Sequence, residues 1–276
     1  MTAITAILGF ADAEFRIALR NRWVIILTVT MAAFALVLAL AGSGPTGTLG
    51  ADQLSVTVAS LTGLAVYLVP LIALLISFDA ISGEIERGTL GLTLAYPVAR
   101  PAILMGKIVA HVAILVFVLL VGYGVAAAVA LRLDAEASRG LGALLRLYWS
   151  SLLLGASFIG LGYLASGLSR RPATAAGLVI GMWLLLIVLY DLGMLAAIVA
   201  DDGGLFTELV FPWMLIANPA DAFRLYNLSA SGATAAASGV AGAANSIMPL
   251  QALASIIIWP FIAFGLAAWR FRRIAP

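Results

Sequence analysis

Six stretches of this 276-residue chain are each apolar for about twenty residues, the length that an α-helix needs to cross the hydrocarbon core of a bilayer. Inside lipid every backbone polar group must find its hydrogen-bond partner within the protein, which favours helices over open sheets. The sequence therefore predicts an all-α polytopic membrane protein, organised as one transmembrane domain over residues 1–276. The six predicted spans lie at about 23–42, 56–78, 108–131, 148–168, 177–199 and 248–269.

Composition agrees with this prediction and excludes several chemistries. The chain is 63% hydrophobic and only 10% charged, whereas a soluble domain carries about 25% charged residues. It has no Cys and one His, which excludes a thiolate metal site and a paired-histidine zinc motif. A dyad of Ser157 with His111 is conceivable, but no Gly-x-Ser-x-Gly motif surrounds the serine. We therefore predict no catalytic residue and no metal ligand.

Residues 1–22 carry both acidic and basic side chains, which is unlike a cleaved signal peptide. Apolar residues recur there at helical spacing, and this pattern predicts an amphipathic helix that lies in the membrane interface. The alternative is an ordinary charged flank of the first span. The apolar positions are Ile4, Ile7, Leu8, Ala11, Phe15 and Leu19.

Basic residues gather on one side of the predicted topology. Eleven of the fifteen Lys and Arg residues share a side with the two termini, and four fall on the other. Basic loops stay inside, so we expect both termini in the cytoplasm. The eleven are Arg16, Arg20, Arg22, Arg87, Arg100, Lys107, Arg170, Arg171, Arg270, Arg272 and Arg273, and the four are Arg132, Arg139, Arg146 and Arg224.

The longest predicted outer segment is 200–247. Its part 211–228 is apolar and aromatic, but Pro212 and Pro219 interrupt it, so it reads as a pair of short helices that dip into the outer interface. Its part 229–246 is rich in small residues that have little to bury.

Asp191 is the one acidic residue deep inside a predicted span. An aspartate at the bilayer centre costs about 2.5–3.5 kcal/mol on insertion scales, so its presence needs a reason. One interpretation is a substrate or proton site. The other is an aspartate that hydrogen-bonds to a neighbouring helix or faces an outer vestibule.

Small residues four apart also recur in the spans, and such pairs let helices approach closely in lipid. The pairs are Ala156 with Gly160, Gly162 with Ser166, and Gly177 with Gly181.

Residues 79–107 form a charged insert between the second and third spans, and such a segment must project from the lipid. Gly88 and Pro97 bound a predicted short helix over 89–95, and a return helix begins near Pro101. The alternative is a plain polar connector, for which 29 residues are far too many. The insert does not end in a phosphate-binding loop, because Pro101 and Ile108 replace the required Gly and Ser or Thr.

The motifs of this insert resemble the coupling-helix region of ABC-2 type transporter permeases. They run Glu84-x-Glu86-Arg87-Gly88-Thr89-Leu90, then Leu94-Ala95-x-Pro97-Val98-x-Arg100, then Gly106-Lys107. Gly91 and Ala99 depart from the family, which commonly has an acidic residue and a serine there. The segment 218–225 resembles, more narrowly, the permeases of nitrous oxide reductase maturation systems.

This resemblance implies a permease subunit that binds no cofactor itself. Its partners would be a second copy of the chain, a cytoplasmic NosF-like ATPase that binds ATP and Mg, a periplasmic NosD-like protein and the lipid bilayer, with no nucleic acid. The implied ATPase-coupling residues are Glu84, Glu86, Arg87, Gly88, Thr89, Leu90, Leu94, Pro97, Arg100 and Lys107. The implied periplasmic contacts are Trp213, Asn218, Pro219, Asp221, Phe223 and Arg224.

By the same resemblance the work done is export, or force applied to the periplasmic partner, in the maturation of a copper enzyme. The absence of Cys and the single His favour force transmission, or export of a sulfur species, over passage of copper through this chain. The competing interpretation is a self-contained secondary transporter or channel. That class calls for charges in several spans and a repeat between the halves, and neither is visible.

Overall fold

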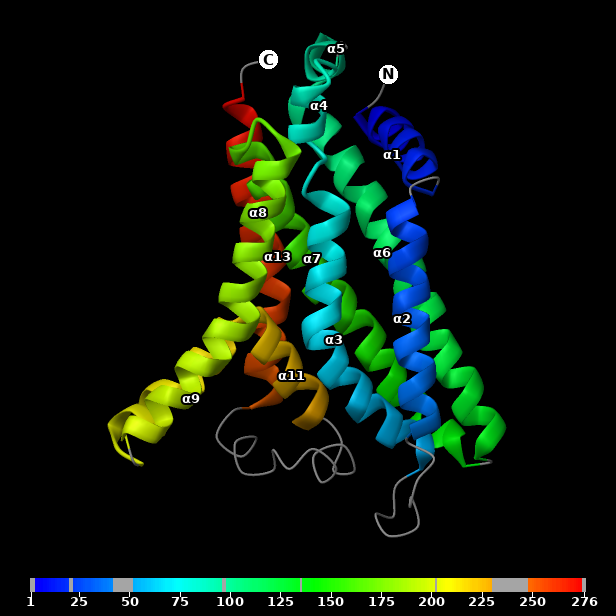
Figure 1. Ribbon diagram of the computed structural model, residues 1–276, viewed down its shortest axis with the longest axis vertical. Coiled ribbons are helices and arrows are strands. Elements are labelled where there is room, and N and C mark those ends of the chain that lie inside the picture. Colours follow the sequence, from blue (N-terminus) through cyan, green and yellow to red (C-terminus); the bar gives the residue numbers. More distant parts are fainter. Residues whose placement is uncertain are drawn as a thin grey trace.

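The described part of the chain contains six helical spans, as the sequence predicts (Figure 1). The computed structural model describes residues 3–19, 22–41, 52–95, 98–134, 136–201, 203–229 and 248–274. Each span is long and apolar enough to cross a membrane. Four of them are α2 (Arg22–Ala41), α3 (Gln53–Ser77), α6 (Arg100–Leu133) and α7 (Leu141–Leu168). The fifth joins α8 (Pro172–Trp183), η3 (Leu184–Leu189) and α9 (Tyr190–Asp201), and the sixth is α13 (Pro249–Arg272).

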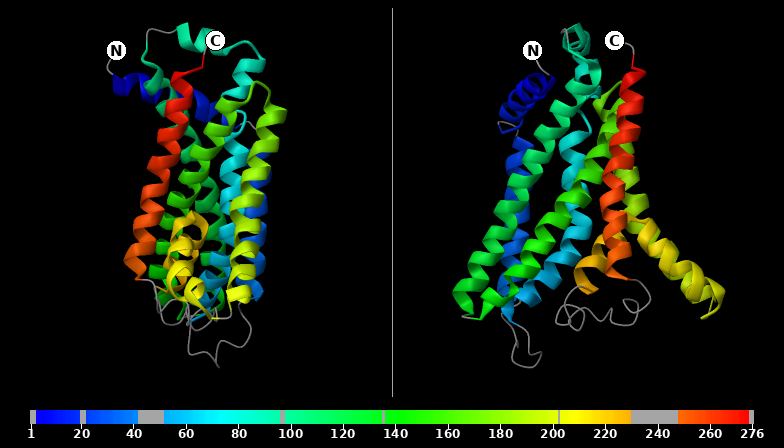
Figure 2. Two further views of the ribbon diagram at one scale, coloured as in Figure 1. Left: turned by 90° about the vertical axis from the view of Figure 1, so that its left-hand side faces the viewer. Right: turned by 180° about the vertical axis from the view of Figure 1, so that it is seen from behind.

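Short helices occupy the two ends of this bundle. The end that carries both chain termini, here called the α4–α5 end, holds α1, α4 and α5 (Figure 1). The opposite end, here called the hairpin end, holds α10 and α11 and the short segments η2 and η4 (Figure 2). Their bounds are α1 (Ala3–Leu19), α4 (Ser82–Glu86), α5 (Leu90–Ala95), η2 (Ala137–Gly140), η4 (Phe206–Val210), α10 (Phe211–Ala217) and α11 (Pro219–Ser229).

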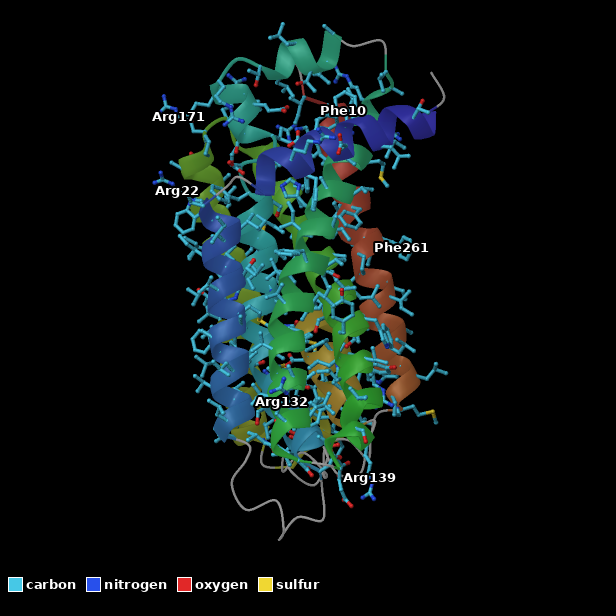
Figure 3. The ribbon with its side chains drawn as sticks, turned by 90° about the vertical axis from the view of Figure 1, so that its right-hand side faces the viewer. Phe10, Arg22, Arg132, Arg139, Arg171 and Phe261 are labelled. Carbon is cyan, nitrogen blue, oxygen red and sulfur yellow. The ribbon has the colours of Figure 1, made fainter. Side chains whose placement is uncertain are left out.

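Helix α1 lies across the end of the spans rather than along them (Figure 3). This is the orientation expected of an interfacial helix. It contacts α6 at Gly106, where an added Cβ would sit 2.6 Å from the Cβ of Phe10 and 3.0 Å from the carbonyl oxygen of Ile7. Gly106 therefore lets the backbone of α1 rest directly on α6.

Helix α7 is the most buried span, since 72% of its most apolar window lies inside the protein. It packs against α3 on one side and α13 on the other. Glycines from two of the predicted small-residue pairs allow α7 to approach these two helices closely. A Cβ on Gly160 would lie 2.6 Å from the Cβ of Ala263 on α13, and one on Gly162 would lie 2.0 Å from Ser77 Oγ on α3. Gly177 and Gly181 face open space instead.

The fifth span differs from the uninterrupted helix expected at 177–199. Its middle, Leu184–Leu189, is π-helical, and beyond this point α9 leans away from the other helices (Figure 1). Only 11% of its most apolar window is buried, less than in any other described span. Hydropathy cannot detect a π-helical turn, because the turn changes the phase of the helix and not its composition.

We expect Gly160→Ala to destabilise the bundle by about 1–3 kcal/mol, because the new methyl group overlaps Ala263 and the backbone of Phe264. The thermal unfolding midpoint in detergent measures the loss. Gly265→Ala is the matched control, since nothing lies within 4 Å of its Cβ position. Equal midpoints for the two variants would contradict this account of the α7–α13 contact.

Candidate functional site

At the α4–α5 end, helix α4 ends in a tight turn at Gly88. The amide of Thr89 donates to the carbonyl of Glu84 at 2.9 Å, and that of Gly88 donates to the carbonyl of Ile85 at 3.1 Å. These two bonds form a Schellman motif, which requires a left-handed residue just past the helix. Gly88 supplies it with φ 69°. The chain then turns into α5, whose bounds fit the predicted short helix over 89–95.

The tip formed by α4 and α5 exposes a mixed surface. Glu86, Arg87 and Gly88 are exposed, and Leu92 on α5 is 70% exposed although it is apolar. Leu90 is buried beneath them and ties α5 to the core. Of the other implied coupling residues, Thr89 and Leu94 are half-buried, and Pro97 lies outside the described residues.

Lys107 is an ion bridge between three helices. Its ammonium on α6 contacts the carboxylate of Glu14 on α1, and it contacts Glu84 Oε1 on α4 at 2.7 Å. The lysine side chain is 3% exposed, while those of Glu84 and Glu14 are 14% and 24% exposed. A buried ammonium needs such partners, because leaving water is costly for an unpaired charge. The cluster therefore fixes α1 and α4 relative to α6.

A polar cavity of about 470 Å³ lies beside this bridge. Charged side chains of both signs line it, including Asp79 and Arg87, and Glu84 Oε2 is buried there without a hydrogen-bond partner. His111 closes one wall, with Nδ1 2.9 Å from the carbonyl oxygen of Lys107 and 2.6 Å from the hydroxyl of Tyr163. Ser157 instead donates to the carbonyl of Leu153, so the Ser157–His111 pair is not formed. The described residues hold no group of three or more metal-ligating side chains.

Neighbouring spans anchor both ends of the insert. The Ser166 hydroxyl on α7 accepts the amides of Ile81 and Ser82, each at 2.9 Å, and so caps the start of α4. Arg100 at the start of α6 donates to the carbonyls of Arg272 and Ile274, at 3.3 and 2.8 Å, at the end of α13. A cation at a helix C-terminus is stabilised by the helix dipole. The insert is therefore fastened to α6, α7 and α13 as well as to α1.

At the hairpin end, α10 and α11 form the predicted pair of short helices, and side chains from the spans bind their backbone ends. Ser255 and Trp259 of α13 donate to the carbonyls of Ile216 and Ala217, at 2.5 and 3.0 Å. Asn218 donates through Nδ2 to the carbonyl of Leu186 in the π-helical segment, at 2.6 Å, and accepts from the amide of Ala220. The hairpin is thus inserted among the spans with its helix ends satisfied.

Asp191 has partners on this hairpin. Arg224 of α11 reaches Asp191 Oδ2 at 3.0 Å and Asp221 Oδ1 at 3.2 Å, so one guanidinium joins two carboxylates. The sequence did not reveal this arrangement, because nothing in 211–228 shows how deeply the hairpin inserts. Burial first, and then the nearby charge of Asp191, raise the pKa of Asp221 to about 7, although Arg224 acts in the opposite direction.

The other implied periplasmic contacts divide by burial. Trp213 is 64% exposed and Arg224 is half-buried, whereas Asn218, Pro219, Asp221 and Phe223 are buried within the chain. These four pack inside the hairpin region of the chain, and the partner contact implied for them stays a prediction.

Comparison with known proteins agrees with this architecture. The family model described as ABC-2 family transporter protein matches residues 9–274. The chain belongs to the ABC-2 family of transporter permeases. Within this family it is 42% identical over 268 residues to a protein of Pseudomonas aeruginosa named a probable ABC transporter permease protein NosY, covering 95% of this chain and 96% of that protein. It is 40% identical over 269 residues to a protein of the same name from Stutzerimonas stutzeri, covering 96% and 97%.

In this ABC-2 protein we expect Lys107→Met to be strongly destabilising, by about 3–5 kcal/mol, because it leaves two partly buried carboxylates facing one another. The thermal unfolding midpoint in detergent measures the effect. Adding Glu14→Gln and Glu84→Gln to the lysine variant removes the stranded charges and should restore most of the midpoint. If Lys107→Met alone unfolds like the unmodified chain, the bridge does not fix these helices.

Stability should also depend on pH through Asp221. Its pKa lies above the ordinary 3.8 in the folded chain, so folding favours the protonated acid. The resulting stabilisation is full below about pH 4 and is lost as the pH rises through about 7. We expect the unfolding midpoint to fall from pH 5 to pH 8, and Asp221→Asn to flatten this fall. Glu136→Gln, at an exposed ion pair of the same end, should leave it unchanged.

Proposed function

We propose that the chain is the membrane permease subunit of an ABC transporter complex, in which a separate ATPase subunit binds ATP and Mg and docks at the α4–α5 end. The observation that carries this proposal is the Lys107 bridge, which joins α4 to α1 and α6. A segment that projects from the spans and is rigidly joined to them can act as a lever, transmitting movement of a cytoplasmic partner to the spans.

The tip of this lever is suited to a protein partner. Leu92 and the charged residues Glu86 and Arg87 are exposed together on the short helices. An exposed apolar side chain with a charged rim is the usual composition of an interface. A displacement of α5 would reach α4 through the Schellman motif at Gly88. The contacts of Ser166, Lys107 and Arg100 would then transmit this displacement to α7, α6 and α13.

The orientation follows from the distribution of arginines. Arg22 and Arg171 lie at the α4–α5 end, while Arg132 and Arg139 lie at the hairpin end (Figure 3). With the larger basic set at the α4–α5 end, the positive-inside rule supports a cytoplasmic position for that end and for both termini. The protein is accordingly proposed to reside in a bacterial inner membrane.

The fifth span supports a second copy of the chain as a partner. It is the least buried described span, and Gly177 and Gly181 lie open on α8 with nothing within 4 Å of their Cβ positions. Small residues on an unpartnered face allow two helices to approach closely in lipid. We place the homodimer contact on α8.

The hairpin end is the proposed site of conformational work on a periplasmic partner. An apolar groove of about 530 Å³ runs between α10 and α13 there, and the exposed Trp213 lines it. Similarity to two proteins named NosY and the segment 218–225 support a role in maturing the copper site of nitrous oxide reductase, alongside a NosD-like periplasmic protein.

Leu92→Asp provides the test. Because Leu92 is 70% exposed, we expect the variant to fold normally but to lose the co-purifying ATPase subunit and its activity. Co-purification of the tagged chain from its native host measures this. Leu205→Asp is the control, since Leu205 is similarly exposed, at 73%, and lies next to η4 at the hairpin end of the bundle. If no ATPase accompanies the unmodified chain, the secondary-transporter interpretation gains and the proposal fails.

A further inference from the structure

A second cavity at the α4–α5 end is independent of the Lys107 bridge. It has a volume of about 370 Å³ and lies between the turn from α7 to α8 and the last turn of α13. Ile85 of α4 forms another part of its wall. The cavity therefore touches the coupling segment from the side opposite to α1.

The charge of this cavity is one-sided. Arg170, Arg270 and Arg273 line it, and no Asp or Glu is among its lining residues. None of the three forms an ion pair with the described residues. The Nε atom of Arg270 is buried without a hydrogen-bond partner, an arrangement that native proteins avoid. Three guanidinium groups that surround one hollow, with no carboxylate of the described residues paired to them, favour the binding of an anion.

Local packing positions two of these arginines, Arg270 and Arg273. A Cβ at Gly167 would meet Arg270 Cγ at 3.2 Å, so the missing side chain lets the arginine stem lie across the end of α7. Arg273 stacks its guanidinium over the ring of Trp269, at 4.2 Å from the centroid. These two cationic groups are thus positioned before any ligand arrives, which lowers the entropic cost of binding one.

We propose that this cavity binds the phosphate group of an anionic phospholipid from the inner leaflet. Guanidinium groups bind phosphate oxygens in paired hydrogen bonds, and basic pockets between spans on the cytoplasmic side are suited to lipid head groups. The mouth favours a lipid over a soluble anion. Leu168 lines it and is exposed, and the exposed Trp269 lies where α13 leaves the bundle, as interfacial tryptophans do.

A lipid bound there would contact Ile85 and the end of α13 together. Arg100 already joins the end of α13 to the start of α6. Head-group binding would therefore brace the same helix ends that anchor the insert. The coupling interpretation and the choice of the inner leaflet rest on the proposed function, whereas the basic cavity and its binding of a phospholipid do not.

Native mass spectrometry of the full-length chain, purified with the subunits that accompany it, tests the site. The probes are phosphatidylglycerol, phosphatidylcholine and inorganic phosphate. We expect selective retention of phosphatidylglycerol, and Arg270→Gln and Arg170→Gln should each weaken it about fivefold, the effect of about 1 kcal/mol for one basic residue. Arg170 is exposed, so its variant decides the matter if Arg270→Gln does not fold.

Arg22→Gln is the charge-matched control, because Arg22 is exposed at the same end of the molecule on α2 (Figure 3). It should keep the affinity of the unmodified chain. Equal binding of the two lipids, equal weakening by Arg22→Gln, or full displacement by inorganic phosphate would overturn the lipid assignment. So would a variant Arg270→Gln that keeps its lipid and loses its ATPase, since the pocket would then receive an acidic protein segment. Loss of lipid with the ATPase retained leaves the proposed function intact.

Discussion

The burial of one ammonium group, that of Lys107, sets the geometry of the α4–α5 end. A charge almost withdrawn from water is tolerated only while both of its carboxylate partners stay in place. Glu14 and Glu84 come from segments separated by the first two spans, so this requirement connects parts of the chain that the backbone leaves independent. The helix α1 is thereby committed to the bundle although it crosses no membrane, and Gly106 provides the flat surface on which it rests.

Apolar length alone predicts the six spans, and turn chemistry predicts the short helix between Gly88 and Pro97. Both depend on neighbouring residues in the chain, which is why they are legible in the sequence. The small-residue pairs are also visible in the sequence, but the sequence does not show which of them lie at a helix–helix contact. Gly160 and Gly162 face neighbouring helices, while Gly177 and Gly181 do not. That distinction depends on which helices become adjacent, and no local pattern encodes it.

The polar residues near the hairpin end of the spans show the same limit. In the sequence nothing connects three residues of the spans, Asp191, Ser255 and Trp259. In the structure all three bind groups of the α10–α11 hairpin. Two short helices placed among spans expose backbone ends and a guanidinium, and each needs a partner where water is scarce. Asn218 and Phe223, which the resemblance implies as partner contacts, are buried within the chain, and the sequence does not show this because the depth of the hairpin is a tertiary property.

The π-helical segment 184–189 changes the direction in which side chains point on the second half of the fifth span relative to the first half. Each residue of an α-helix advances the direction of its side chain by about 100°, so a wider turn changes the phase of all that follows. The half before the segment packs on the bundle through Val179, and the half after it presents Asp191 to the hairpin. In a regular helix the direction of Asp191 relative to Val179 would therefore differ from the one observed. The wider turn thus sets the angle at which one span meets two neighbours, the bundle along its first half and the hairpin along its second.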